Sequence, residues 1–118
     1  MNGEMEVPWA VTPEKVEAVV QRLIALARPR RIILFGSYAR GEVNCDSDLD
    51  VLVVTDELPS PRAESARLRR ALRDISMPMD ILVIPQSALD QLRYRSDLIY
   101  REACDKGQVV YERELSLA

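Results

Sequence analysis

Three short apolar runs constrain the fold of this chain more than any other feature of its sequence. They lie at Arg31–Phe35, Leu49–Val54 and Met79–Ile84, and each is an almost continuous stretch of apolar residues. Strands with one exposed face alternate apolar and polar residues, whereas strands buried on both faces do not. We therefore predict three strands of a mixed α/β domain, each buried on both faces.

The segments between these runs carry the end signals and the periodicity of helices. Thr12 and Ser60 are capping residues, and each is followed by the proline that is favoured at the first helical position. Ser87 and Asp90 have the spacing of a capping box. We predict a helix from residue 13 to near residue 29, helices over 61–75, from 87 onward and over 97–106, a turn and loop over 36–47, and a short strand over 109–111.

The length of 118 residues is typical of one domain. We predict a single α/β domain over residues 1–118, with residues 1–11 as a flexible N-terminal lead. No apolar run approaches the roughly 20 residues that span a bilayer, and the N-terminus lacks the pattern of a signal peptide. Cys45 and Cys104 match no disulfide or metal spacing. We therefore expect a cytoplasmic protein with free thiols and no membrane partner.

The sequence contains no histidine. A Ser-His-Asp or Cys-His catalytic site and a histidine-ligated zinc site are therefore excluded within this chain. A bound metal must be held by oxygen atoms, which favours Mg²⁺, Mn²⁺ or Ca²⁺. The net charge of −3 lacks the basic excess of nucleic-acid-binding domains, so nucleic acid is not expected as a direct substrate.

Two aspartates, Asp48 and Asp50, stand at the start of the second apolar run. Alternate side chains of an extended segment share a face, so both carboxylates point the same way. Like charges at this spacing repel each other unless a cation lies between them. A divalent metal at the rim of the core would satisfy both carboxylates, together with the phosphates of a substrate.

A third acid, Asp80, lies near the start of the third apolar run. In isolation, a solvent-exposed acid is the preferred interpretation of Asp80, because aspartate is rarely buried without a partner. If its strand neighbours the strand that carries Asp48 and Asp50, three carboxylates converge. Three carboxylates are enough for a two-metal site, in which one ion activates the attacking hydroxyl and the other holds the leaving phosphates.

Gly36 and Ser37 follow the first apolar run and form a candidate phosphate-binding turn. Glycine lets the backbone approach a ligand closely, and N–H groups exposed at such a turn can cradle phosphate. A Gly-Ser pair alone is also compatible with a plain tight turn. Its combination with Asp48 and Asp50, which follow after ten intervening residues, and with a later strand acid is much more specific.

The loop after the first run resembles the signature of the DNA polymerase β nucleotidyltransferase superfamily. The matching residues are Gly36–Gly41 (GSYARG), followed by Asp46–Asp50 (DSDLD). Within this superfamily the chain resembles the minimal nucleotidyltransferases, the MNT family. The resemblance implies a nucleotidyltransferase fold in which a mixed sheet is backed by helices.

The resemblance also implies roles for individual residues. Ser37, next to Gly36, corresponds to the serine that contacts the triphosphate of the nucleotide. Asp48 and Asp50 correspond to the aspartates that bind both Mg²⁺ ions. Asp80 corresponds to the strand acid that completes the site of the ion that activates the nucleophile.

The partner and the substrate follow from the resemblance too. MNT proteins are typically paired with a HEPN-family toxin, and as antitoxins they can silence it by transferring AMP from ATP to a tyrosine. We therefore predict a Mg²⁺-dependent protein adenylyltransferase whose acceptor comes from a partner chain. The alternative is a binding module that neutralises its partner by occlusion, without catalysis.

Arginines are the remaining candidates for binding. Arg40 lies in the signature loop, where it could contact a phosphate or pair with Glu42. Further arginines cluster in the helix predicted at 61–75, where they form either a solvated face or a docking surface for an acidic partner or RNA. The clustered residues are Arg62, Arg67, Arg69, Arg70 and Arg73, of which Arg62, Arg69 and Arg73 share one sector opposite Leu68 and Leu72.

Overall fold

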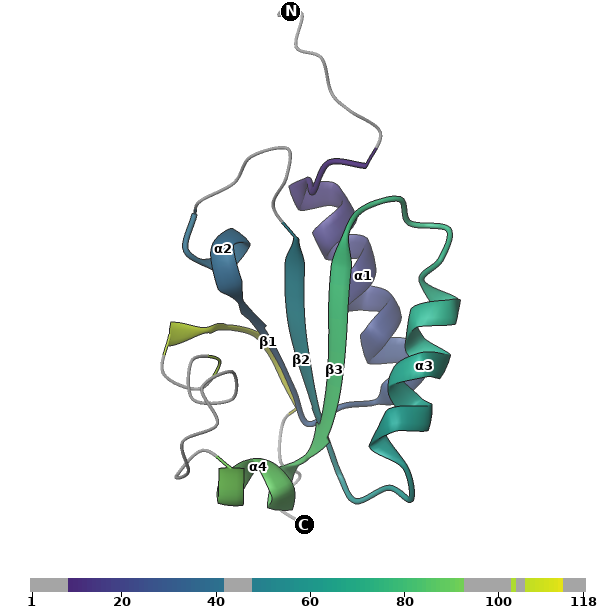
Figure 1. Cartoon of the computed structure of the whole chain (residues 1–118), viewed down its shortest axis with the longest axis vertical. Helices are drawn as coiled ribbons and strands as arrows, with labels where there is room; N and C mark the ends of the chain where they lie inside the picture. The colour runs from purple at the N-terminus through teal and green to yellow at the C-terminus, as the bar shows by residue number, and fades with distance from the viewer. Residues whose placement is uncertain (1–8, 42–47, 93–102, 104–105, 114–118) are drawn as a thin grey trace, which may run out of the picture.

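The computed structural model describes residues 9–41, 48–92, 103 and 106–113. Figure 1 shows how these residues are arranged around one sheet. In chain order the elements are α1 (Pro13–Ala27), β1 (Arg31–Phe35), α2 (Gly36–Ala39), β2 (Leu49–Thr55), α3 (Pro61–Ala71), β3 (Met79–Pro85), α4 (Gln86–Leu92) and β4 (Gln108–Glu112).

The strands form one mixed sheet in the order β3-β2-β1-β4. β1 pairs antiparallel with β2 and with β4, whereas β2 and β3 run parallel and are joined through α3. In Figure 1, α1 lies behind the sheet and α3 lies beside β3. The prediction of a mixed α/β sheet is confirmed.

The two longest helices begin where their capping signals predict. Thr12 Oγ1 accepts a hydrogen bond from the backbone N–H of Lys15 at 3.2 Å. Ser60 Oγ accepts one from the backbone N–H of Ala63 at 3.1 Å. These bonds satisfy N–H groups that have no partner within the first turn of a helix.

Apolar side chains cover both faces of the sheet. On one face, alternate strand residues pack against α1 and α3 in a cluster that includes Leu23, Val51 and Leu68. On the other face, the remaining strand residues pack against α4 and Ala103 in a cluster that includes Leu89. The prediction of burial on both faces is therefore confirmed for β1, β2 and β3, whereas β4 is largely exposed.

Two predictions of helices and loops were wrong. Gly36–Ala39 form the short helix α2, although the sequence of this segment predicts a loop. The helix α3 ends at Ala71 instead of near Ile75. Leu72 leaves the helical conformation, with φ −102° and ψ 7°, and the bond from Ile75 N to Leu72 O spans only three residues. The last turn is therefore tightened rather than continued.

The prediction of a capping box at the start of α4 was also wrong. The helix already begins at Gln86, so Ser87 lies inside it. The hydroxyl of Ser87 donates to the carboxylate of Glu57, and Asp90 accepts a hydrogen bond from the Gln86 side chain at 2.8 Å. Both side chains therefore make contacts that local spacing does not reveal.

Several predictions concern residues outside the described part of the chain. They include Cys45, Cys104, most of the helix predicted at 97–106 and residues 1–8 of the predicted lead. Of the lead residues that are described, Val11 is buried in the core beside α1. No helix among the described residues is both long and apolar enough to cross a membrane.

Candidate active site

The parallel pairing of β2 with β3 brings two of the predicted site residues together. Asp50 and Asp80 are direct register partners. The residues that follow them, Val51 and Ile81, are buried in the core beneath α1 and α3. Because side chains alternate along a strand, Asp50 and Asp80 project from the opposite face of the sheet. The prediction that the strand of Asp80 neighbours the strand of Asp50 is confirmed.

Asp48 lies immediately before β2 and is exposed. Leu49, between the two aspartates, is fully buried in the core on the α1 and α3 side. The N–H of Leu49 donates to the carbonyl oxygen of Pro78 at 3.0 Å, which fixes this point against the start of β3. The alternation therefore places Asp48 on the same side as Asp50.

Gly36 packs against Asp50 at the junction of β1 and α2. Phe35, the last residue of β1, is the register partner of Asp50. Gly36 has a φ of +79°, and a Cβ built on it would lie 3.1 Å from Cγ of Asp50 and closer still to Oδ2. Only glycine combines this backbone conformation with so close an approach.

Ser37 and Arg40 lie on α2, at the same end of the sheet as the carboxylates. Ser37 is half-buried in the first turn of the helix, and Arg40 is exposed at its end. The backbone N–H of Arg40 donates to the carbonyl oxygen of Gly36 at 3.2 Å. Glu42, the alternative partner for the Arg40 side chain, lies outside the described residues.

A basic side chain from α3 reaches the third carboxylate. Nη2 of Arg69 donates to Oδ1 of Asp80 and to the carbonyl oxygen of Ile81, each at 3.3 Å. The side chains of Arg69 and Asp80 are 53% and 52% exposed. Helical spacing predicts only that Arg69 faces outward, because it does not reveal which strand edge lies beside the helix.

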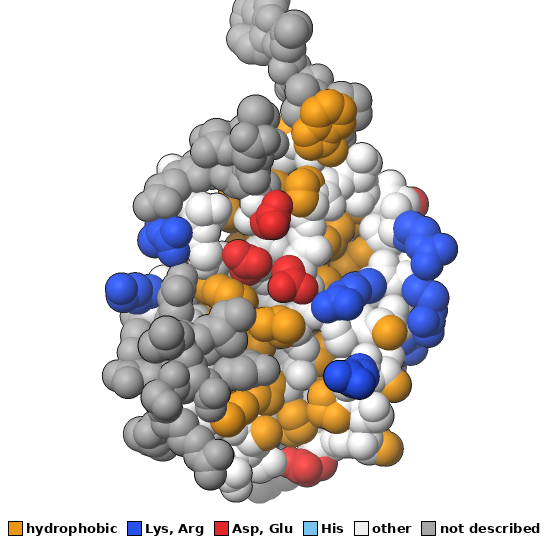
Figure 2. Space-filling view, viewed as in Figure 1, with side chains coloured by type: hydrophobic (Ala, Val, Ile, Leu, Met, Phe, Trp, Pro, Cys, Tyr) orange, Lys and Arg blue, Asp and Glu red, His pale blue; other side chains and the backbone are white. Residues whose placement is uncertain are grey.

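The donor atoms at this end of the sheet suit a divalent cation. Figure 2 shows acidic side chains gathered over the starts of β2 and β3, with basic side chains on either side. Asp48, Asp50 and Asp80 offer only oxygen ligands, as Mg²⁺ prefers. Within the described part of the chain, no three His, Cys, Asp or Glu side chains are already grouped so as to hold a metal ion. The chemistry of the donor atoms therefore fits a divalent cation.

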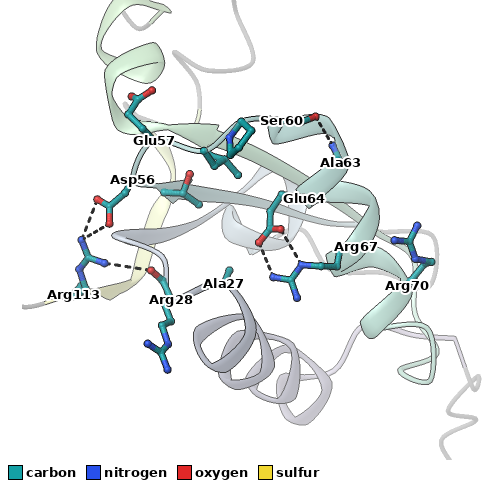
Figure 3. Close-up of a pocket in the computed structure, with 13 residues that line it drawn as sticks. Ala27, Arg28, Asp56, Glu57, Ser60, Ala63, Glu64, Arg67, Arg70 and Arg113 are labelled. Atoms are coloured by element: carbon teal, nitrogen blue, oxygen red, sulfur yellow. Dashed lines mark hydrogen bonds and ion pairs between the residues drawn. The ribbon is translucent and has the colours of Figure 1, made fainter.

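A hollow of about 730 Å³ lies at the other end of β2 (Figure 3). Two ion pairs line it, Arg113 with Asp56 at 3.1 Å and Arg67 with Glu64 at 2.7 Å. Hydrogen bonds from Arg67 lower the pKa of the Glu64 carboxyl. The length of β2 separates this hollow from the aspartates by about 16 Å. None of the predicted site residues lines it.

The sequence of the chain matches the model of a known domain family. Residues 14–109 match the family model described as the nucleotidyltransferase domain. This stretch covers most of the chain and contains all of the predicted site residues. The chain therefore belongs to the nucleotidyltransferase domain family.

Two sequence relatives are similar to parts of the chain. A Methanocaldococcus jannaschii protein, provisionally named a protein adenylyltransferase, is 44% identical over 55 residues, which are 47% of this chain and 54% of that protein. The protein adenylyltransferase MntA of Thermococcus cleftensis is 58% identical over 31 residues, which are 26% of this chain and 31% of that protein. The chain thus matches about half or less of the length of these relatives.

Two crystal structures share the fold. A chain from a mutant of the toxin-antitoxin MntA-HpeT has a TM-score of 0.57 and 19% identity, over 88% of this chain and 75% of that one. A chain from a toxin-antitoxin with AMP-PNP has a TM-score of 0.50 and 21% identity, over 83% and 74% of the two chains. These similarities agree with the family match on the architecture.

Proposed function

We propose that this chain is a Mg²⁺-dependent nucleotidyltransferase that transfers AMP from ATP to a hydroxyl of a partner protein. The observation that carries the proposal is the register of β2 and β3, which sets Asp50 beside Asp80 on the face that Gly36 borders. Membership of the nucleotidyltransferase domain family supports it. So do the names of the two matched relatives and the structure of the same fold that was solved with AMP-PNP.

In the proposed reaction Asp48, Asp50 and Asp80 would hold Mg²⁺, with Asp80 completing the site of the ion that activates the acceptor hydroxyl. When bound, Mg²⁺ neutralises phosphate charge and lowers the pKa of the attacking hydroxyl. Two observations support this role: Asp48 and Asp50 share a face of the sheet, and Asp80 is the register partner of Asp50. Their strands continue into the core, which makes the backbone that carries them rigid.

The nucleotide is oriented from the other side, by α2. The missing Cβ of Gly36 lets the backbone approach both Asp50 and a bound triphosphate. The hydroxyl of Ser37 donates to a phosphate oxygen, and the exposed guanidinium of Arg40 offers a charged donor to the same group. Together these groups hold the α-phosphate in line with the acceptor hydroxyl, which is where the rate advantage of positioning arises.

We further propose that the acceptor is a tyrosine hydroxyl of a HEPN-family toxin, so that the chain acts as an antitoxin. The resemblance to the MNT family supports this identity of the partner. The toxin-antitoxin structures of similar fold support the biological context. The names of the sequence relatives support a protein as the acceptor.

A labelling experiment tests the function directly. The purified chain is incubated with ATP labelled at the α-phosphate, Mg²⁺ and the product of the neighbouring gene. We expect label to move to that protein, to require Mg²⁺ and to map to a tyrosine by mass spectrometry. Label that stays in ATP while the two proteins form a tight complex would refute catalysis.

A substitution of Asp80 is expected to separate nucleotide binding from transfer. In Asp80→Asn, transfer should fall by at least about a hundredfold, because the metal ion that activates the acceptor hydroxyl loses one of its carboxylate ligands. Binding of ATP should change by less than about fivefold, because Asp48 and Asp50 still hold the metal that carries the phosphates. Calorimetry with a non-hydrolysable ATP analogue measures binding. Equal losses of binding in Asp80→Asn and Asp48→Asn would contradict this division of roles.

A binding module that acts by occlusion is the second candidate function. The outer side of α3 and of the turn that follows it favours this function, because Arg62, Arg69 and Arg73 are exposed there. The inner side of the same segment is buried through Leu68 and Leu72. Such a strip suits an acidic partner surface. If an Asp48→Asn, Asp50→Asn variant still forms the complex and still neutralises the partner, occlusion is sufficient.

A further inference from the structure

Arg69 lies on a helix that covers one face of the sheet, but it contacts a carboxylate, that of Asp80, on the other face. The helix α3 packs through Leu68 and Leu72 on the face that also buries Ile81. Asp80 projects from the other face, beside Asp50. In the described sheet β3 is the outer strand, and Arg69 reaches around its edge to Asp80.

The position of Arg69 is fixed by packing and hydrogen bonds. Ser65, one helical turn earlier on α3, donates its hydroxyl to the carbonyl oxygen of Ile81 at 2.6 Å. The guanidinium of Arg69 donates to the same carbonyl oxygen and to Asp80. Leu68 and Leu72, on either side of Arg69, are almost fully buried. The helix is thereby held against the edge of β3, with one cation directed at the start of the strand.

We propose that Arg69 is a counter-ion that competes with a divalent metal for the carboxylate of Asp80. The inference rests on the proposed function, because it concerns the residue that would complete the metal site. Its basis is that the register sets Asp80 beside Asp50, while the guanidinium of Arg69 already holds the carboxylate of Asp80. Arg69 is a positioning residue in this scheme, and it touches neither the nucleotide nor the acceptor.

The strength of the contact suits a displaceable counter-ion. Both hydrogen bonds of Arg69 are long, at 3.3 Å, and the ion pair is half-exposed. Exposed pairs of this kind contribute little and are screened by salt. A divalent cation therefore displaces the guanidinium at a modest cost in affinity. In this scheme the displaced guanidinium keeps its hydrogen bond to the carbonyl oxygen of Ile81, and it pairs with Asp80 again when the metal leaves.

Binding of Mn²⁺ alone, followed by electron paramagnetic resonance of the free ion, tests this inference without any measurement of catalysis. In Arg69→Ala we expect Mn²⁺ to bind about three- to fivefold more tightly than in the wild type at low salt. The gain should shrink as salt is raised. Arg70→Ala is the matched control, because it removes the same charge from the next residue, which lines the distal hollow. It should change the affinity by less than about 1.5-fold.

A second pair of variants identifies Asp80 as the target. In an Asp80→Asn background, adding Arg69→Ala should have no effect on Mn²⁺ affinity, because the competition no longer exists. Unchanged or weaker binding in Arg69→Ala, with circular dichroism showing a native fold, would overturn the proposal. If Mn²⁺ affinity is also insensitive to Asp48→Asn and Asp50→Asn, the proposed function itself fails, so the two failures are distinguishable.

Discussion

Replacing Asp48 and Asp50 together by asparagine should lower the rate of AMP transfer by at least about a thousandfold. Both side chains keep their size, while the negative charges that hold the metal are lost. The Lewis-acid contribution of a bound metal is several kcal/mol, and about 4 kcal/mol corresponds to this change in rate. Single-turnover transfer from α-labelled ATP measures the effect.

The control for this pair lies on the same strand. Asp56 follows the other end of β2, where it is exposed and pairs with Arg113 at 3.1 Å and with Arg30 at 3.4 Å. In Asp56→Asn we expect transfer within about twofold of the wild type, because exposed pairs contribute only about 0–1 kcal/mol. A double Asp48→Asn, Asp50→Asn variant that keeps more than about a tenth of the activity would refute the metal-binding role.

Substitution of Gly36 by alanine is expected to be almost as damaging to transfer, although it changes no charge. The added Cβ would overlap the carboxylate of Asp50, and φ is +79° at this residue. Either Asp50 or the start of α2 must move. We expect at least about a hundredfold slower transfer, since small displacements of a reacting group are costly. The free energy of unfolding should fall by about 2–4 kcal/mol.

Gly41 provides a matched comparison that separates backbone strain from the contact with Asp50. It also has a positive φ, of +81°, but a Cβ added there meets no atom of the described residues within 4 Å. Gly41→Ala should therefore cost about 1–2 kcal/mol of stability and leave transfer within about fivefold of the wild type. Denaturant titration and the transfer assay measure both quantities. If the two alanine variants lose transfer equally, the contact between Gly36 and Asp50 is not the cause.

Much of the fold could be predicted because its signals are local. The apolar runs locate β1, β2 and β3 to within one residue of their observed ends. Thr12 and Ser60 make the capping bonds that their positions predict. One of the errors occurs where a side chain has a partner elsewhere in the fold: Ser87 bonds to Glu57 rather than capping its own helix.

In the candidate site, too, some residues could be recognised from the sequence, and one required the structure. Gly36, Ser37, Asp48 and Asp50 are recognisable from the sequence because they lie in one short segment with a fixed spacing. Their binding roles stay predictions. The sequence predicts that Asp80 lies near Asp50 only if their two strands are neighbours. The pairing of β2 with β3 meets that condition.

The sequence by itself determined the class of fold, the starts of α1 and α3 and the segment that carries the family signature. These follow from periodicity, capping and spacing, which act over a few residues. The tertiary structure alone decided that β2 pairs in parallel with β3, that Gly36 packs against Asp50 and that Arg69 reaches Asp80. Those contacts join residues from different elements, and their proximity depends on strand order and register. Both are set by the packing of the whole core rather than by any local pattern.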